Sequence, residues 1–280
     1  MMKYLVTGAR GQLGAEFVKK LKDCYAFGKE ELDISNLSEV LRVLKELKPH
    51  VVINCAAYNY VDKAEEEFER ALQVNAFGVL NLAVACKEIG AFFVHYSTDY
   101  VFDGKKEGLY IENDRPNPIN KYGLTKYIGE EIIPKILDNY LIFRTSWVYG
   151  EGKQNFLYKL SQWAKTQEYL RIACDEFSVP TSTRIIVEIS LLAIEKGLTG
   201  LYHLVCSNYA SRYEWAKEYL KLIGIKKFIY PVYQTEFKLS ALRPRFSAMS
   251  NKKLSKILDI EIPSWDEELK RFLQRTKLCL

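Results

Sequence analysis

The chain has 280 residues, of which 48% are apolar and 27% are charged, and its formal net charge is +5. This composition excludes a disordered chain, and the mild charge without a concentrated basic run argues against a nucleic-acid partner. Membrane association is not expected either, because no stretch approaches the ~18 uncharged apolar residues that a spanning helix needs.

The first half of the chain alternates short β-type runs with amphipathic helical stretches. Strands are predicted at 3–6, 24–27, 51–53, 92–96 and 141–144. Helices are predicted between them at 12–21, 37–47, 62–89 and 122–136. Because continuous apolar strands alternate with helices, we expect an α/β fold, with a Rossmann-like, doubly wound parallel sheet covered on both faces.

The pattern changes after residue 147. Helices are predicted at 155–166, 183–196, 212–223 and 265–276, with a short strand at 201–205. We therefore divide the chain into a dinucleotide-binding domain over 1–147 and a smaller, mixed, mainly substrate-binding region over 148–280. The boundary is soft, because 183–205 could return to pack on the first sheet.

The cysteines form no Cys-x-x-Cys pair and have no histidine partners at zinc spacing; they stand at positions 24, 55, 86, 174, 206 and 279. Only three histidines occur in the whole sequence. We interpret the cysteines as free apolar groups in a reducing cytoplasm, and we expect no metal site. The expected localisation is cytoplasmic.

A glycine motif follows the first predicted strand. Residues 7–14 read Thr-Gly-Ala-Arg-Gly-Gln-Leu-Gly, which places Gly8, Gly11 and Gly14 at a strand-to-helix turn. Glycines there let a pyrophosphate approach the backbone amides at the helix N-terminus, where the helix dipole favours anions. The motif alone is weak, but its position between a strand and a helix indicates a dinucleotide site.

The end of the second strand indicates which dinucleotide binds. Lys29 stands where an acidic residue would hold the ribose 2′-hydroxyl of NADH, and Arg10 lies in the glycine loop. This favours NADPH, with NADH left open. A solvated loop position is the alternative for Lys29. Asp33 and Ile34 are candidates to flank the adenine.

Tyr122 and Lys126 stand four residues apart on a predicted helix, so their side chains share one face. The ammonium is expected to lower the phenol pKa, and a tyrosine acid beside a nicotinamide would protonate an alkoxide as hydride arrives. Thr98 or Ser97, at the end of the fourth strand, would hydrogen-bond the same carbonyl oxygen. Most Tyr-x-x-x-Lys matches are exposed helix pairs, so the order of the three motifs carries the prediction.

The order of these motifs resembles the extended short-chain dehydrogenase/reductase group. Within it, longer strings resemble the dTDP-4-dehydrorhamnose reductase family. They cover residues 54–65, 95–102, 143–150, 200–205 and 243–244. The resemblance therefore extends over essentially the whole chain.

The resemblance implies roles for individual residues. Tyr122 would be the proton donor, Lys126 its electrostatic partner and an anchor for the nicotinamide ribose, and Thr98 the group that polarises the ketone. Asp99 and Trp147 match positions that contact the sugar nucleotide. The positions that match cofactor contacts are Gly11, Gln12, Leu13, Asp33, Ile34, Ala57, Tyr58, Asn59 and Tyr96.

The resemblance also implies a reaction, the NAD(P)H-dependent reduction of the C4 ketone of dTDP-4-dehydro-L-rhamnose to dTDP-L-rhamnose. Two alternatives are a non-catalytic NADP-binding regulatory subunit of methionine adenosyltransferase and a reductase of another nucleotide sugar. Some family members bind Mg²⁺ at a dimer interface through glutamates. Glu16 matches one of them, but Arg184 stands where another is expected, so no metal is predicted and the chain is expected to be a monomer or homodimer.

Overall fold

The computed structural model describes residues 2–276, and a six-stranded parallel sheet forms its centre. Its strands are β1 (Tyr4–Thr7), β2 (Tyr25–Phe27), β3 (Val51–Asn54), β4 (Phe92–Thr98), β5 (Tyr140–Thr145) and β10 (Gly200–His203). The order across the sheet is β10-β5-β4-β3-β1-β2. The chain reverses its direction of travel across the sheet between β1 and β3, and ligands of such sheets bind beyond the carboxyl ends of the strands at that point.

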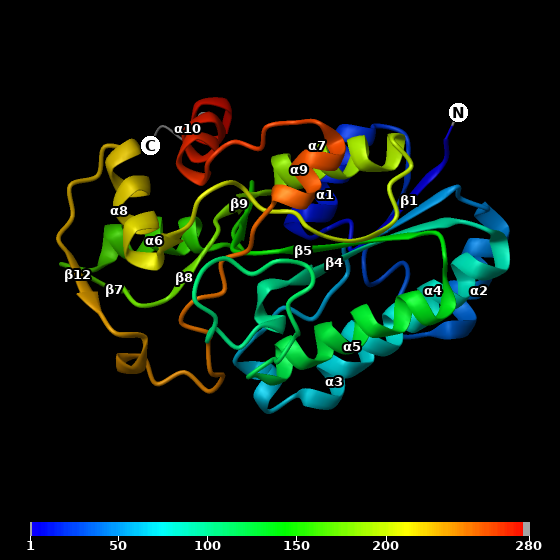
Figure 1. Cartoon of the computed structure of the whole chain (residues 1–280), viewed down its shortest axis with the longest axis horizontal. Helices are drawn as coiled ribbons and strands as arrows, with labels where there is room; N and C mark the ends of the chain where they lie inside the picture. The colour runs from blue at the N-terminus through cyan, green and yellow to red at the C-terminus, as the bar shows by residue number, and fades with distance from the viewer. Residues whose placement is uncertain (1, 277–280) are drawn as a thin grey trace.

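Helices cover both faces of this sheet, which confirms the predicted doubly wound fold. One face carries α1 (Gln12–Leu21) and α7 (Thr183–Glu195), which contact each other. The opposite face carries α2 (Leu37–Leu47), α4 (Gly78–Ile89) and α5 (Lys121–Ile136), as Figure 1 shows. The inner strands β1, β3, β4 and β5 are almost fully buried, which is why they read as continuous apolar runs, whereas the edge strand β2 is largely exposed.

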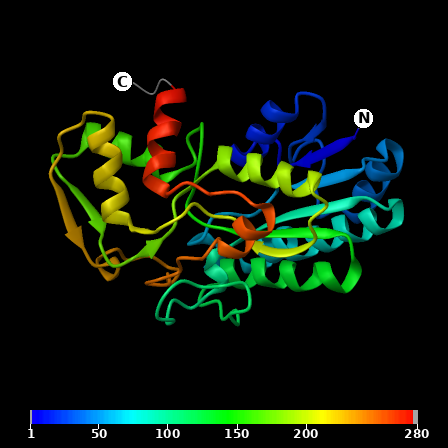
Figure 2. The same ribbon diagram turned by 45° about the horizontal axis from the view of Figure 1, so that its top comes forward.

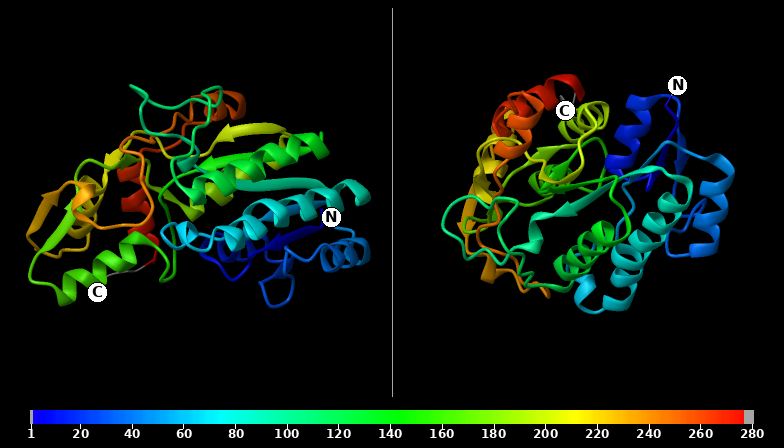
Figure 3. Two further views of the ribbon diagram at one scale, coloured as in Figure 1. Left: turned by 90° about the horizontal axis from the view of Figure 1, so that it is seen from below. Right: turned by 45° about the vertical axis from the view of Figure 1, so that its right-hand side comes forward.

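The second half of the chain contributes to two places. A separate group of elements packs at one end of the sheet around its own core, which contains Trp147 and Trp215 (Figures 2 and 3). Its helices are α6 (Phe156–Thr166), α8 (Arg212–Leu222) and α10 (Trp265–Thr276). Its strands are β6 (Val148–Tyr149), β7 (Leu170–Ala173), β8 (Phe177–Ser178), β9 (Thr181–Ser182), β11 (Ala210–Ser211) and β12 (Ile229–Val232). In contrast, α7 and β10 lie on the main sheet, and α9 (Lys252–Leu258) packs beside β10.

The single helix predicted over 62–89 is wrong in detail. The segment contains the short 3-10 helix η1 (Lys63–Glu65), α3 (Phe68–Leu72), a π-helical turn η2 (Gln73–Phe77) and then α4. The π turn brings the Asn75 carbonyl so close to Gly129 of α5 that a Cβ there would lie 2.3 Å from the oxygen. Close packing against α5 therefore accompanies this local departure from α-helical geometry.

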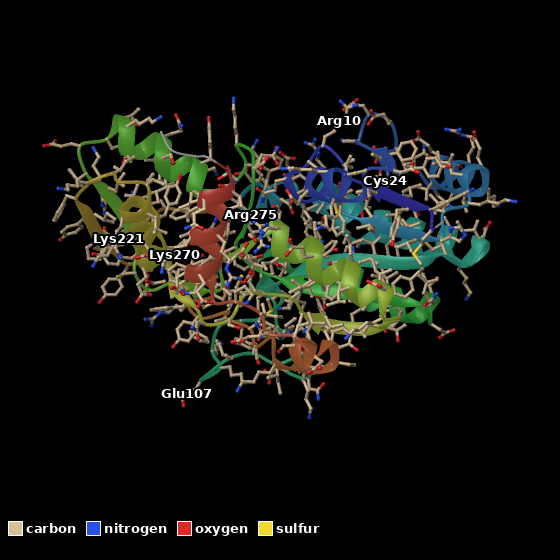
Figure 4. The ribbon with its side chains drawn as sticks, turned by 90° about the horizontal axis from the view of Figure 1, so that it is seen from above. Arg10, Cys24, Glu107, Lys221, Lys270 and Arg275 are labelled. Atoms are coloured by element: carbon tan, nitrogen blue, oxygen red, sulfur yellow. The ribbon has the colours of Figure 1, made fainter. Side chains whose placement is uncertain are left out.

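Several observations on the described residues bear on membrane, metal, charge and cysteine predictions. Within 2–276, no helix is long and apolar enough to cross a membrane, and no group of three or more His, Cys, Asp or Glu is arranged to hold a metal ion. Arg184 forms ion pairs with Glu188 and Glu268. In Figure 4, Arg10 lies on the part of the molecule that holds the main sheet, away from Lys221 and Lys270. The cysteines up to position 206 are free, and Cys279 lies outside the described residues.

Candidate active site

The turn after β1 is packed too tightly for side chains. Gly8 has a φ of +62°, and a Cβ there would lie 2.5 Å from the Ala56 nitrogen, while one at Gly14 would lie 2.3 Å from the Gly8 carbonyl oxygen. Helix α1 begins after Gly11, which supplies no side-chain cap, and its first turn holds no acidic residue. The amides at this helix end are therefore free to bind a phosphate.

The end of β2 contains a carboxylate that the sequence analysis missed. Glu31 accepts a hydrogen bond from the Gly28 amide at 2.6 Å and forms an ion pair with Arg10. This ion pair lowers the pKa of Glu31, so the carboxylate is charged at neutral pH. Lys29 is exposed in the same loop. Glu31 lies four residues beyond the end of β2, which explains why it did not stand out in the sequence.

Four predicted cofactor residues lie around this turn. The Gln12 amide donates to the main chain of β6 at 3.0 Å, and Leu13 packs against the core below α1. Asp33 accepts hydrogen bonds from the amide and hydroxyl of Ser35, at 3.0 and 2.7 Å. Ile34 is buried. They therefore shape the loops that surround the glycine turn.

Residues 57–59 follow β3 on the side facing α5. The Tyr58 amide donates to the Asn75 side chain at 2.8 Å, and the Asn75 amide group returns a bond to the Tyr58 carbonyl at 3.1 Å. The Tyr58 hydroxyl donates to Glu67. Ala57 is half-buried and Asn59 is exposed. The backbone of residues 57–59 is therefore held by the side chain of Asn75, which belongs to the π-helical turn η2. The sequence did not predict this turn.

Thr98, Tyr122 and Lys126 meet where β4 ends and α5 begins. The Asn120 side chain caps α5 by accepting the Gly123 amide at 2.7 Å. A Cβ at Gly123 would lie 2.2 Å from the Tyr100 carbonyl oxygen, so only glycine lets the helix start this close to the strand end. As a result, Tyr122 at the start of α5 lies beside the Thr98 side chain at the end of β4.

The pKa of Tyr122 differs from the expectation. Burial raises it to about 12, the neighbouring Thr98 hydroxyl opposes this change, and the charge of Asp99 adds to it. The expected lowering by Lys126 is therefore wrong for this structure. Burial lowers the pKa of Lys126 itself to about 8. The sequence shows that the two side chains share a helix face, but it does not show how deeply the fold buries them.

Lys126 is directed toward β4. Its ammonium donates to the Tyr96 carbonyl at 2.6 Å, and the side chain is almost fully buried. The Tyr96 side chain points to the other face of the sheet, where its hydroxyl donates to Ser190 at 2.7 Å. Successive side chains of a strand point to opposite faces of the sheet, and the Tyr96 side chain is on the face away from Lys126. Tyr96 therefore contributes its main-chain carbonyl to the site.

Asp99 and Trp147 lie beside the same strand ends but are enclosed by protein. Asp99 is 2% exposed and accepts hydrogen bonds from three hydroxyl groups. Trp147 has a φ of +40°, which is unusual for a residue with a side chain. The Arg212 guanidinium lies 3.7 Å from the centre of a Trp147 ring, and Trp215 stacks on the same side chain.

Comparison with known proteins identifies the family. The model of the RmlD substrate binding domain matches residues 2–278. A curated dTDP-4-dehydrorhamnose reductase of Burkholderia thailandensis is 34% identical, with 94% of this chain and 95% of that protein covered. This chain belongs to that family. Solved reductase structures from Clostridium acetobutylicum and Bacillus anthracis, the latter in complex with NADP, are each 37% identical, with TM-scores of 0.96 and 0.95. The alignments cover 99% and 98% of this chain and all of each of those chains.

Membership in the reductase family supports an oxidoreductase over the regulatory-subunit and other-sugar alternatives.

A pocket of about 710 Å³ lies beside Trp147, and the sequence did not predict it. Its lining combines aromatic and cationic side chains, including Phe156, Trp163, Phe237, Arg171, Arg212 and Arg243. These residues come from widely separated segments, so no local motif marks them. Arg243 lines the pocket and forms an ion pair with Asp62, whereas the nearby Arg245 is exposed.

Proposed function

We propose that this protein uses NADPH to reduce the C4 ketone of dTDP-4-dehydro-L-rhamnose, which gives dTDP-L-rhamnose. The family match over the whole chain supports this reaction. The observation that carries it is the convergence of Thr98, Tyr122 and Lys126 at the carboxyl edge of the sheet, beside a glycine turn suited to a phosphate. When bound, NADPH supplies the hydride.

The cofactor is held by the residues that surround the glycine turn. The free amides at the start of α1 bind its diphosphate, because Gly8 and Gly14 leave no side chain in the way. Arg10 and Lys29 attract the ribose 2′-phosphate. Lys126 anchors the nicotinamide ribose. The remaining predicted contacts are Gly11, Gln12, Leu13, Asp33, Ile34, Ala57, Tyr58, Asn59 and the main chain of Tyr96.

Tyr122 donates its phenol proton to the C4 oxygen during reduction. Because burial raises its pKa to about 12, the phenol is protonated throughout the neutral range. The buried ammonium of Lys126 then stabilises the tyrosinate that remains. Thr98 donates a second hydrogen bond to the same oxygen, so the developing negative charge has two hydroxyl donors.

The nucleotide part of the substrate binds in the pocket beside Trp147. Its aromatic walls suit a base, and its arginines suit a diphosphate. The Tyr100 hydroxyl donates to Glu176 of this pocket at 3.3 Å, and the Tyr100 ring packs edge-to-face on Tyr122. These contacts connect the pocket to the proton donor. Asp99 and Trp147 are the other proposed substrate-contacting residues, and Trp147 adjoins the pocket through Arg212.

This arrangement supports the proposal that cofactor binding and substrate binding are assigned to different parts of the chain. Residues 1–147 form the dinucleotide-binding domain and 148–280 mainly the substrate-binding region. Residues 183–205 belong structurally to the first, because α7 packs on α1 and β10 pairs with β5. The partner is a dTDP-sugar, and the protein is proposed to act in the cytoplasm as a monomer or homodimer.

The direct test is to incubate the purified protein with NADPH and enzymatically prepared dTDP-4-dehydro-L-rhamnose. We expect NADPH oxidation that depends on the ketosugar and yields dTDP-L-rhamnose, identified by mass and by NMR. A parallel reaction with the corresponding UDP-linked ketosugar measures selectivity for the base. Folded protein that binds NADPH but oxidises none in the presence of the ketosugar would contradict the proposed reaction.

The Glu31 carboxylate predicts a limit on cofactor selectivity. It competes with a 2′-phosphate for Arg10, and it can accept the 2′-hydroxyl of NADH. Replacing Glu31 with Gln is expected to raise the ratio of kcat/KM for NADPH over NADH by about tenfold, a change of roughly 1.4 kcal/mol in discrimination. Glu30→Gln is the control, because it removes the same charge from the same loop. Equal effects of both substitutions would argue against a specific role for Glu31.

A further inference from the structure

The segment that carries Arg243 belongs to the second half of the chain but is attached to the first. The Leu242 carbonyl accepts a hydrogen bond from the Asn120 side chain at 2.8 Å, and the Ala241 amide donates to Asp62 at 3.2 Å. Asn120 is also the N-cap of α5, the helix that begins with Lys121 and carries Tyr122. The main chain beside Arg243 is therefore held to the helix start that carries the proposed proton donor.

Asp62 binds the end of the Arg243 guanidinium. Nη1 donates to Oδ1 at 2.9 Å and Nη2 donates to Oδ2 at 2.6 Å, so the two groups form a bidentate ion pair. Nη1 also donates to the Ala241 carbonyl at 2.7 Å. The Arg243 side chain is 13% exposed. These bonds fix the orientation of the guanidinium, although it stands at the end of a long, flexible side chain.

One edge of the Arg243 guanidinium is left over. A guanidinium has five N–H donors in a fixed plane. Asp62 and Ala241 accept from three of them, and within residues 2–276 no other group accepts a hydrogen bond from this side chain. The remaining two belong to Nε and Nη2, which lie on the same side of the plane. Such a side-on edge matches two oxygens of a phosphate group.

The position of its acidic partner distinguishes Arg243 from the other arginines of the pocket. Arg212 pairs with Glu176 at 3.2 Å, and because both side chains line the pocket, the carboxylate opposes an anion there. Arg171 is about half exposed, so solvent screens its charge. Asp62 is not one of the lining residues. Arg243 therefore presents its donors to the pocket without its carboxylate partner standing in the same space.

We propose that Asp62 is a positioning residue, which holds the Arg243 guanidinium end-on so that its side-on edge binds the diphosphate of the nucleotide sugar. This inference rests on the proposed function, because it takes the pocket beside Trp147 as the nucleotide site. Asp62 directly precedes η1 in the dinucleotide-binding half of the chain. That half therefore contributes to substrate affinity as well as to cofactor binding.

The charge and the geometry of Asp62 have opposite effects on an anionic ligand. A carboxylate beside Arg243 lowers the positive potential of the pocket, so charge alone predicts that its removal strengthens binding. Orientation predicts the reverse, because a released arginine must be ordered again when the ligand binds. Ordering one such side chain lowers affinity by about three- to tenfold. The direction of the change in an Asp62 variant therefore distinguishes the two effects.

The test measures the Kd of dTDP by calorimetry, so it requires neither the ketosugar nor turnover. We expect Asp62→Asn to weaken dTDP binding by about three- to tenfold and to leave the Kd of NADPH within about twofold. Asparagine keeps one oxygen for the Ala241 amide, so the main chain retains its support. Unchanged or tighter dTDP binding would overturn the inference, as would an equal loss of NADPH affinity. A parent protein that bound no dTDP would instead count against the proposed nucleotide site.

A double-mutant cycle separates positioning from general structural support. Arg243→Met removes the guanidinium and keeps an unbranched side chain, so it should weaken dTDP binding at least as much as Asp62→Asn. In the Arg243→Met background, Asp62→Asn should change the Kd of dTDP by less than about twofold, because the group that it positions is gone. If the two losses multiplied instead, Asp62 would act through something other than Arg243 and the inference would be wrong.

Steady-state kinetics with the ketosugar provide a second measurement. In Asp62→Asn, KM should rise in parallel with the Kd of dTDP while kcat stays within about threefold, because the lost interaction is not specific to the transition state. Glu66→Gln is the matched control, since Glu66 is an exposed acid of the same turn. It should leave both KM and the Kd of dTDP unchanged. Equal effects of Glu66→Gln and Asp62→Asn, or a loss confined to kcat, would contradict the positioning role.

Discussion

Replacing Tyr122 with Phe is expected to lower kcat for the ketosugar by about 10²–10⁴-fold, the usual contribution of a positioned proton donor. The substitution removes the hydroxyl that lies beside Thr98 at the end of β4 and leaves the ring packed against Tyr100. NADPH affinity should stay within about twofold of the parent value, because the glycine turn and Lys126 are unchanged. Steady-state kinetics and fluorescence titration of NADPH measure the two effects separately.

Tyr127→Phe is the control for this experiment. Tyr127 lies on the same helix, and its hydroxyl is associated with Glu131 rather than with the site. It should leave kcat nearly unchanged. A Tyr122→Phe enzyme that turned over at the parental rate would remove Tyr122 from the role of proton donor, even if the protein proved to be a reductase.

Replacing Glu130 with Ala is expected to lower the free energy of unfolding by about 3–5 kcal/mol, because it leaves a buried guanidinium without its partner. Glu130 of α5 pairs with Arg144 of β5 through bonds of 2.7–3.1 Å. Their side chains are 2% and 4% exposed. The Arg144 guanidinium also lies over the Phe102 ring. Urea denaturation followed by circular dichroism measures the loss.

An exposed ion pair gives the comparison. Glu46 pairs with Arg42 on α2, and both side chains are about two-thirds exposed. Glu46→Ala should therefore change the free energy of unfolding by no more than about 1 kcal/mol. Equal losses of unfolding free energy in Glu130→Ala and Glu46→Ala would show that burial does not increase the contribution of the Glu130–Arg144 ion pair to stability. The pair matters for function because α5 carries Tyr122 and Lys126.

Several features of the site were predictable because they depend on short stretches of chain. Gly8, Gly11 and Gly14 stand at a strand-to-helix turn, where their spacing and position together indicate phosphate binding. Tyr122 and Lys126 share a helix face because of the helical repeat, and Thr98 follows an apolar strand whose carboxyl end faces the ligand edge. Each inference uses local periodicity and the rule for parallel sheets.

Other features required contacts between distant segments. Glu31 became relevant because its side chain folds back to the Gly28 amide. The π turn at 73–77 lies against Gly129 of α5. The pocket beside Trp147 collects residues from segments more than 80 positions apart, from Phe156 to Arg243. Local sequence patterns do not predict such long-range contacts, because the contacts depend on how whole helices and strands pack against one another.

The mild charge and ordinary apolar content of the sequence indicated a globular chain without a membrane span, and the alternating strands and helices determined the doubly wound fold. The motif order indicated the family, and it predicts Thr98, Tyr122 and Lys126 as the reacting side chains. Only the tertiary structure decided their ionisation, because burial at the junction of β4 and α5 raises the pKa values of Tyr122 and Asp99 and lowers that of Lys126. Sequence spacing defines which groups can meet, but solvent exclusion decides which of them hold a proton.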